Sequence, residues 1–177
     1  MKILSGKFKN KNIYFKKNKF IRPVTSYNKK RIFNKLKIYK NSEILDLFCG
    51  SGNISFEFIS NDCKVLAIDN YKEAINIIKY NIKKLKINNN TITYKHIDVI
   101  KFLKNNKKKF NIIFIDPPYK YTIIKINIII NYIYKYKFLK KKGIIILSNL
   151  YKNKFFFIKK PFYVIKSKKN SFFFFKY

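Results

Sequence analysis

The residues with the clearest chemical potential are Asp116-Pro117-Pro118-Tyr119, which directly follow the apolar run 111–115. This run has the length and β-branched content of a buried strand, and two prolines cannot continue a strand, so we expect Asp116 at its C-terminal end. Open α/β sheets bind their ligands at that edge. An acid, the carbonyl of Pro117 and an aromatic ring could hold a flat base whose exocyclic amine is to be alkylated. A strand that ends in a Pro-Pro turn is the simpler interpretation.

A second motif, Asp46-Leu47-Phe48-Cys49-Gly50-Ser51-Gly52, joins an apolar strand to the first turns of a predicted helix. Gly50 and Gly52 would let the backbone approach a ligand closely. Two such glycines are a weak indication alone, and they leave a nicotinamide or flavin site open. The next predicted strand ends at Asp69, which is suited to accept hydrogen bonds from ribose hydroxyls. Asp98, after another strand-like segment, could accept from an adenine amine, so the pattern indicates an adenosine-bearing cofactor.

Acidic residues are few, and their placement is uneven. The chain has 41 Lys and Arg but only eight Asp and Glu, all between 43 and 116, for a net charge of +33. Such a charge favours a polyanionic partner, because lysines that neutralise phosphates release counterions. The abundance of Lys, Asn, Ile, Phe and Tyr also fits drift in an A/T-rich genome, so we credit only part of the charge to nucleic-acid binding.

Length and composition exclude several classes of protein. With 177 residues and 47% hydrophobic content, the chain is expected to form one globular domain, 1–177. We see no signal peptide, and the longest apolar region, 121–136, is interrupted by Lys and Asn, so no membrane span is expected. Cys49 and Cys63 fit a reducing cytoplasm and give no disulfide framework. The sole histidine, His96, leaves no cluster with metal-ligand spacing and no Ser-His-Asp triad.

Hydrophobic periodicity predicts alternating strands and helices, hence an α/β fold with a mostly parallel, doubly wound sheet and an antiparallel end. The Phe172–Phe175 run should be a strand buried on both faces. After Gly143, apolar runs at 144–147, at 155–158 with 162–165, and at 172–175 complete the sheet. The expected elements are a hairpin at 2–15, a basic helix at 25–36, strands at 43–48, 64–69, 91–96 and 111–115, and helices at 53–60, 71–86, 98–105 and 122–137.

The chain resembles the RsmD family of S-adenosylmethionine-dependent methyltransferases, which methylate the exocyclic N2 of one guanine in small-subunit (16S) ribosomal RNA. The resemblance rests on Arg22-Pro23-Val24-Thr25 with Ile32-Phe33-Asn34, on the Asp46–Gly52 turn followed by Glu57 and Ser60, and on Asp116-Pro117-Pro118-Tyr119. The chain departs from the family pattern at Ser26, Tyr27 and Lys30 in the basic helix, and at Asn10, Asn61-Asp62 and near Ser148, where the family has an acid. These departures bear on RNA contacts more than on the chemistry.

The resemblance implies a Rossmann-like class I methyltransferase fold of seven strands, with a basic extension, 1–40, before the catalytic core, 41–177. It implies that S-adenosylmethionine binds to Asp46, Phe48, Gly50 and Gly52 through its methionine and ribose, to Asp69 through the ribose hydroxyls and to Asp98 through adenine. Asp116 and the Pro117 carbonyl would accept the two N2 hydrogens of guanine, while Tyr119 stacks on the flipped base; Pro118 completes this catalytic set. No metal is expected. The partner would be ribosomal RNA or an assembling small subunit, and the protein a cytoplasmic monomer.

Three alternatives remain open. A methyltransferase of the same fold could act on adenine N6 or cytosine N4 in DNA, or on a protein glutamine, since Asp-Pro-Pro-Tyr suits planar amines and amides in general. The substituted helix residues allow a basic RNA-binding or ribosome-assembly protein whose catalytic site is idle. A nicotinamide oxidoreductase lacks a convincing proton donor.

Overall fold

The computed structural model describes residues 1–16, 23–150, 159–167 and 170–176. Its helices and strands alternate from residue 26 to residue 150, as the periodicity predicts. The helices are α1 (Ser26–Lys35), α2 (Asn53–Ser60), α3 (Lys72–Lys84), the short 3₁₀ helix η1 (Asn89–Thr91), α4 (Val99–Asn105) and α5 (Ile123–Lys135). The strands are β1 (Glu43–Leu47), β2 (Lys64–Asp69), β3 (Ile92–His96), β4 (Phe110–Ile115), β5 (Leu139–Leu150), β6 (Tyr163–Ile165) and β7 (Asn170–Lys176).

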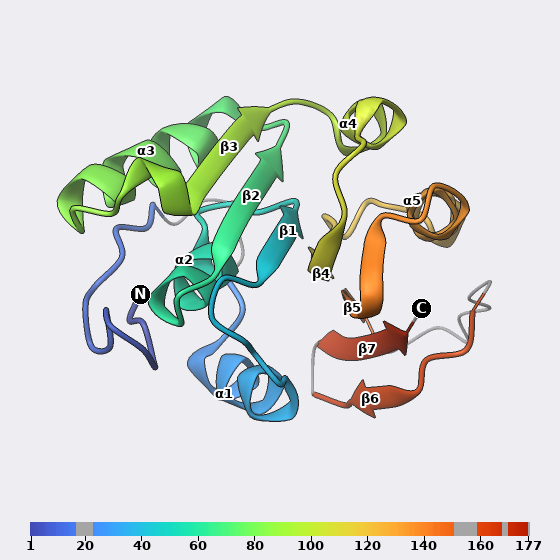
Figure 1. The fold of residues 1–177 in the computed structure, drawn as a ribbon, viewed down its shortest axis with the longest axis horizontal. Coiled ribbons are helices and arrows are strands. Elements are labelled where there is room, and N and C mark those ends of the chain that lie inside the picture. Colours follow the sequence, from blue (N-terminus) through green and yellow to red (C-terminus); the bar gives the residue numbers. More distant parts are fainter. Residues whose placement is uncertain (17–22, 151–158, 168–169, 177) are drawn as a thin grey trace.

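The seven strands form one sheet in the order β3-β2-β1-β4-β5-β7-β6. Neighbouring strands from β3 to β5 are parallel, whereas β7 pairs antiparallel with both β5 and β6. Helices α2 and α3 lie against one face, and α4 and α5 against the other (Figure 1). The predicted fold class, a mostly parallel sheet with an antiparallel C-terminal end, is confirmed.

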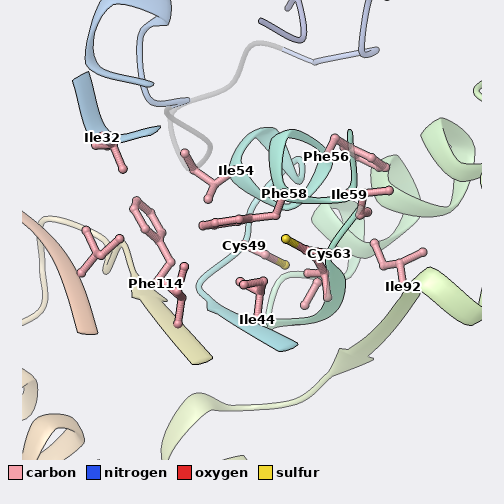
Figure 2. Close-up of a cluster of buried hydrophobic side chains, with 14 of the residues drawn as sticks. Ile32, Ile44, Cys49, Ile54, Phe56, Phe58, Ile59, Cys63, Ile92 and Phe114 are labelled. Carbon is pink, nitrogen blue, oxygen red and sulfur yellow. The ribbon is translucent and has the colours of Figure 1, made fainter. Parts of the chain in front are cut away.

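The pleat of each strand sends alternate side chains to opposite cores. Ile112 and Phe114 join the cluster beneath α2 and α3, part of which Figure 2 shows, while Ile113 and Ile115 join the cluster beneath α4 and α5. The Phe172–Phe175 run divides in the same way, and all four rings are buried. Burial of this run on both faces of the sheet is therefore confirmed.

The predicted N-terminal hairpin is present in a short and irregular form. Its two arms share one antiparallel bridge, Lys2 with Asn12, and the Ile3 N–H donates to the Lys11 carbonyl at 3.0 Å. The turn between the arms docks on α2: the Lys7 N–H donates to the Ser60 carbonyl at 2.8 Å and the Phe8 N–H to the Ser60 hydroxyl at 2.9 Å. The backbone groups of the turn are therefore satisfied by the helix.

Strand β5 is longer than the apolar run 144–147, because Leu139 already pairs with Phe110, and the register shifts before Ile112 pairs with Ile144. Gly143 therefore lies inside a strand, where a Cβ would approach the Lys140 carbonyl oxygen to 2.8 Å. The expected run 155–158 and the motif residue Arg22 lie outside the described residues. Within the described ranges, no helix is long and apolar enough to cross a bilayer.

Candidate active site

A cavity of about 480 Å³ opens where β1, β2 and β4 reach their C-terminal ends. Predicted site residues from three separate motifs line it together: Asp46, Phe48, Gly50, Asp69, Asp116, Pro117, Pro118 and Tyr119. Residues 23 and 24, just before α1, form part of the wall. A second hollow of about 600 Å³ is lined by Leu139 and five lysines, Lys109, Lys137, Lys141, Lys142 and Lys176, and none of these described residues carries a carboxylate.

Two carboxyl groups share the floor of the cavity. Asp46 on β1 pairs with Phe114 on β4, so Asp116 extends from the same sheet face one strand away. Burial raises the pKa of Asp46 to about 7; a hydrogen bond from the Ser55 hydroxyl, 2.5 Å away, opposes this rise, and the charges of Asp116 and Asp69 add to it. Burial likewise raises the pKa of Asp116 to about 6, opposed by a hydrogen bond from Ser148. Two carboxylates that are costly to ionise favour a cationic ligand beside them.

The glycine turn is held in place by Asp69. The Gly50 N–H donates to one carboxylate oxygen of Asp69 at 2.8 Å, and the Tyr71 N–H donates to the other at 2.9 Å. Burial raises the pKa of Asp69, and these backbone hydrogen bonds work against that rise. Phe48 adopts a positive φ of 62°, which is unusual for a residue with a large side chain, and its ring meets Tyr121 edge-on at 4.9 Å. The strained backbone of Phe48 is therefore held by contacts with residues outside the turn, Asp69 and Tyr121.

Sequence reasoning missed two polar residues of this turn. Ser51 Oγ and Asn53 Oδ1 are buried, line the cavity and have no hydrogen-bond partner among the described residues. The Asn53 amide nitrogen donates to the Val24 carbonyl at 2.7 Å, which fixes the orientation of that side chain. Because unpaired buried polar atoms are costly, this pair indicates a ligand that both donates and accepts hydrogen bonds. Their place beside the helix N-terminus in a glycine turn was a signal that could have been used.

Two predicted cofactor contacts do not line the cavity. A Cβ at Gly52 would come within 2.7 Å of the Phe56 ring and 3.2 Å of Ile78, so its missing side chain permits the packing of α2 and α3 there. Asp98 caps α4: its Oδ1 accepts from the backbone N–H groups of Ile100 and Lys101 at 2.9 and 3.0 Å. For both residues, contact with the cofactor stays a prediction.

The other residues considered in the sequence analysis are Cys49, His96 and Tyr119, and their surroundings indicate their roles. Burial raises the pKa of the Cys49 thiol well above its ordinary value, so this cysteine is no ready nucleophile. His96 is exposed, with Nε2 3.0 Å from the Asn70 carbonyl oxygen. Tyr119 lies at the cavity mouth, 46% exposed, and its hydroxyl donates to Asn170 Oδ1 at 3.1 Å. Among the described residues no cluster of His, Cys, Asp and Glu could hold a metal ion.

A family model described as "Conserved hypothetical protein 95" matches residues 1–175. The chain belongs to this family. Two relatives from Buchnera aphidicola, both named "Ribosomal RNA small subunit methyltransferase D", confirm the resemblance to the RsmD family. The protein of the Acyrthosiphon pisum subspecies is 37% identical over 78% of this chain and 72% of its own length. That of the Baizongia pistaciae subspecies is 36% identical over 71% of this chain, and the match spans 64% of that relative.

Solved structures place this Conserved hypothetical protein 95 member among the class I methyltransferase folds. An Escherichia coli protein provisionally described as the methyltransferase yhhF superposes with a TM-score of 0.85, covering 99% of this chain and 97% of that one at 17% identity. The SAH-bound methyltransferase PaMTH1 of Podospora anserina superposes with a TM-score of 0.53 over 60% of this chain and 45% of that one, at 16% identity. At these identities the likeness shows the fold alone.

Proposed function

We propose that the protein is an S-adenosylmethionine-dependent methyltransferase that modifies the exocyclic N2 of a guanine in small-subunit ribosomal RNA. One observation carries the proposal: Asp46 and Asp116 face one cavity from neighbouring strands, with the glycine turn on one side and Tyr119 at the mouth. In this arrangement, a binding site for a cationic methyl donor at Asp46 and the glycine turn adjoins a binding site for a planar amine at Asp116 and Tyr119. The names of the Buchnera relatives suggest the substrate class.

The residues present fit the cofactor. The unpaired Ser51 hydroxyl can donate to a carboxylate and the unpaired Asn53 carbonyl oxygen can accept from an ammonium group, as the methionine part of the cofactor would require. Asp69 can accept from ribose hydroxyls, because it borders the cavity next to Gly50. The bound cofactor supplies an electrophilic methyl group on a sulfonium. The positive charge near Asp46 would favour ionisation of that carboxyl, whose pKa burial has raised.

The segment Asp116-Pro117-Pro118-Tyr119 would direct the attacking nitrogen. The N2 lone pair of guanine is delocalised into the ring, so the amine needs precise orientation more than a strong base. Asp116 and the Pro117 carbonyl would each accept one N2 hydrogen, since both border the cavity, whereas the Pro118 carbonyl is already bonded to the Tyr121 N–H at 2.8 Å. Tyr119 would pack against the flipped base. Asp116, with a pKa of about 6, is ionised at neutral pH and can take up the released proton.

The charge supports a polyanionic substrate, free RNA or an assembling small subunit, on which we propose that the protein acts as a cytoplasmic monomer. All eight acids lie between 43 and 116, and Asp46, Asp69 and Asp116 are gathered in the cavity, so the flanking segments present only positive charge. This arrangement would attract phosphates toward a site that binds a cation.

The test is incubation with methyl-labelled S-adenosylmethionine and one of three acceptors: unmethylated small subunits, naked DNA or a release factor. We expect label in the small-subunit RNA alone, and nucleoside analysis should find N2-methylguanosine. Label in DNA or in protein glutamine would replace the proposed substrate with the corresponding rival. RNA binding without label in any arm would identify an idle RNA-binding protein.

A further inference from the structure

Four polar residues form a row across one face of the sheet at the cavity. Ile115 on β4 pairs with Leu147 on β5, so Asp116 and Ser148, which follow them, are neighbours on adjacent strands. Because alternate residues of a strand share a face, Ser148 points to the same side as Ile146, in the cluster beneath α2 and α3. Asn170 begins β7 and lies on the face of Phe172 and Phe174, so the row continues from Asp46 through Asp116 and Ser148 to Asn170.

Hydrogen bonds link this row to Tyr119 in a single direction. The Tyr119 hydroxyl donates to Asn170 Oδ1 at 3.1 Å, and Asn170 Nδ2 donates to Ser148 Oγ at 3.2 Å. Both polar ends of the Asn170 amide are engaged, which fixes its orientation. Ser148 is only 1% exposed, so water does not compete for its hydroxyl. Since Ser148 Oγ accepts from the amide, its one proton is free to point at the carboxyl of Asp116, its neighbour on the adjacent strand.

We propose that Asn170 and Ser148 are positioning residues, which hold the Tyr119 ring at the cavity mouth and keep Asp116 as a hydrogen-bond acceptor. The inference rests on the proposed methyl transfer and adds the two residues that prepare its acceptor side. An ionised Asp116 can only accept hydrogen bonds, so it selects targets that present N–H groups in the plane of a ring. A hydroxyl beside Asp116 stabilises the charged form of that carboxyl.

Other titratable groups face the same space and enter the interpretation of any pH profile. Asp46 and Asp69 approach from the ends of β1 and β2, Cys49 from the glycine turn, and Tyr71 from the start of α3; the segment after β4 contributes Tyr119, Lys120 and Tyr121. Of these, Asp46 has a pKa of about 7, close to that of Asp116. Substitution at Ser148 separates the two, because Ser148 lies next to Asp116 on the adjacent strand, whereas the serine hydrogen bonded to Asp46 is Ser55.

The test compares Ser148→Ala, Asn170→Ala and Asn170→Asp with the wild type, by turnover against pH and by KM for the RNA. Loss of the Ser148 hydroxyl removes a neighbouring donor that favours the charged form of Asp116, so the pKa of Asp116 rises and the acidic limb of the profile moves to higher pH. A donor to a charged group is worth roughly one pKa unit or slightly more. Turnover by Ser148→Ala should therefore fall about tenfold at pH 6, where less Asp116 is ionised, and less than about twofold at pH 8. Asn170→Asp should move the limb in the same direction, because an acceptor at 170 draws the serine proton away and adds a negative charge.

Asn170→Ala should instead raise the KM for RNA several-fold, because Tyr119 loses its anchor, with a smaller change in the pH profile. Ser148→Thr, which retains the hydroxyl, should restore the acidic limb. Ser171→Ala is the matched control. Ser171 lies on β7 beside Asn170, and its buried hydroxyl has no hydrogen-bond partner among the described residues and does not line the cavity. Carbon-13 NMR titration of the Asp116 carboxyl in the free protein measures the shift without turnover and applies to any folded variant.

An unmoved Asp116 titration in Ser148→Ala, or an equal shift in Ser171→Ala, would overturn the inference. Either result is distinct from failure of the proposed function, in which the wild-type protein itself transfers no methyl group to RNA.

Discussion

At the scale of single residues, the cavity is built from groups that are costly without a ligand. Asp46 is 1% exposed, and Ser51 and Asn53 each keep an unpaired polar atom. Phe48 adds a positive φ. Buried charges, unpaired polar atoms and strained backbone all reduce stability, and they are found together at functional sites, where a bound ligand supplies the missing partners.

Asp46 provides a prediction on stability. Its carboxyl has a pKa of about 7 in the folded protein, raised from 3.8 by burial, so between these values the folded state holds a proton that the unfolded chain has released. This contribution to the free energy of unfolding therefore decreases as pH rises through the window from 3.8 to 7. Asp46→Asn, which has no charge to bury, should stabilise the cofactor-free protein by about 2 kcal/mol at pH 8 and not at pH 4.

Thermal or urea unfolding at the two pH values measures this difference, and calorimetry should show weaker binding of S-adenosylmethionine to the same variant. Equal effects of the substitution at pH 4 and pH 8 would contradict the assigned pKa shift.

At the scale of elements, the N-terminal segment and α1 are fastened to α2 by one buried carboxylate. Glu57 accepts from the backbone N–H groups of Leu4 and Ser5, both at 2.9 Å, and from the Lys29 ammonium at 2.9 Å. Lys29 also donates to the Lys2 carbonyl at 2.9 Å, and both charged side chains are 1% exposed. Because α2 begins at the glycine turn, this cluster also holds the helix that shapes the cofactor side of the cavity.

Lys29→Ala should destabilise the protein by about 3–5 kcal/mol, since Glu57 would keep a buried and uncompensated charge. Lys30→Ala is the matched control on the same helix: Lys30 is exposed, so its removal should change the free energy of unfolding by no more than about 0.5 kcal/mol. Chemical denaturation of both variants makes the comparison. Equal destabilisation by the two substitutions would show that the ion pair has no special role.

Local signals made most elements predictable. Helix α1 starts after Thr25 and α5 after Thr122, and both threonines cap their helices through the side chain. The ends of β2 and β4 were also predictable from local sequence, because the apolar run of each strand stops at an acid, Asp69 or Asp116. Ser148 and Asn170 were not readable as site residues, because their meeting depends on β5 and β7 being neighbours in a given register. The docking of the first turn on Glu57 and Ser60 is equally non-local.

At the scale of the whole molecule, positive charge surrounds a small acidic centre. Near the N-terminal end of β4, the one acid, Glu43, already pairs with Lys108 at 3.1 Å and Lys140 at 3.8 Å. The five lysines of the second hollow lie at that same edge of the sheet. The field outside the molecule therefore attracts polyanions from several directions, and within the described part of the chain the cavity is where carboxylates are grouped for a cation.

Affinity for RNA should consequently fall at least about hundredfold between 50 and 200 mM salt, because each neutralised phosphate releases counterions. Binding of S-adenosylmethionine, which is small and held by buried groups, should change little over the same range. Fluorescence anisotropy for the RNA and calorimetry for the cofactor give the two slopes. RNA affinity that is insensitive to salt would contradict an electrostatic role for the basic surface.

The proposal of a single domain has its own test. Ile3, Ile13 and Ile32 belong to the same core cluster as Phe56 and Phe58 of α2, so the basic extension and the catalytic core should unfold together. Far-ultraviolet circular dichroism and tyrosine fluorescence should report one transition with one midpoint. Two separated midpoints would mean that 1–40 is a unit of its own.

The central claim is that Asp116 directs the target amine and is not needed to hold the cofactor. The most direct measurement is single-turnover methyl transfer to unmethylated small subunits by Asp116→Ala, at a cofactor concentration that calorimetry of the same variant shows to be saturating. We predict transfer below detection, with a dissociation constant for S-adenosylmethionine within about threefold of the wild-type value. Transfer at the wild-type rate, or loss of cofactor binding in parallel with transfer, would contradict the account.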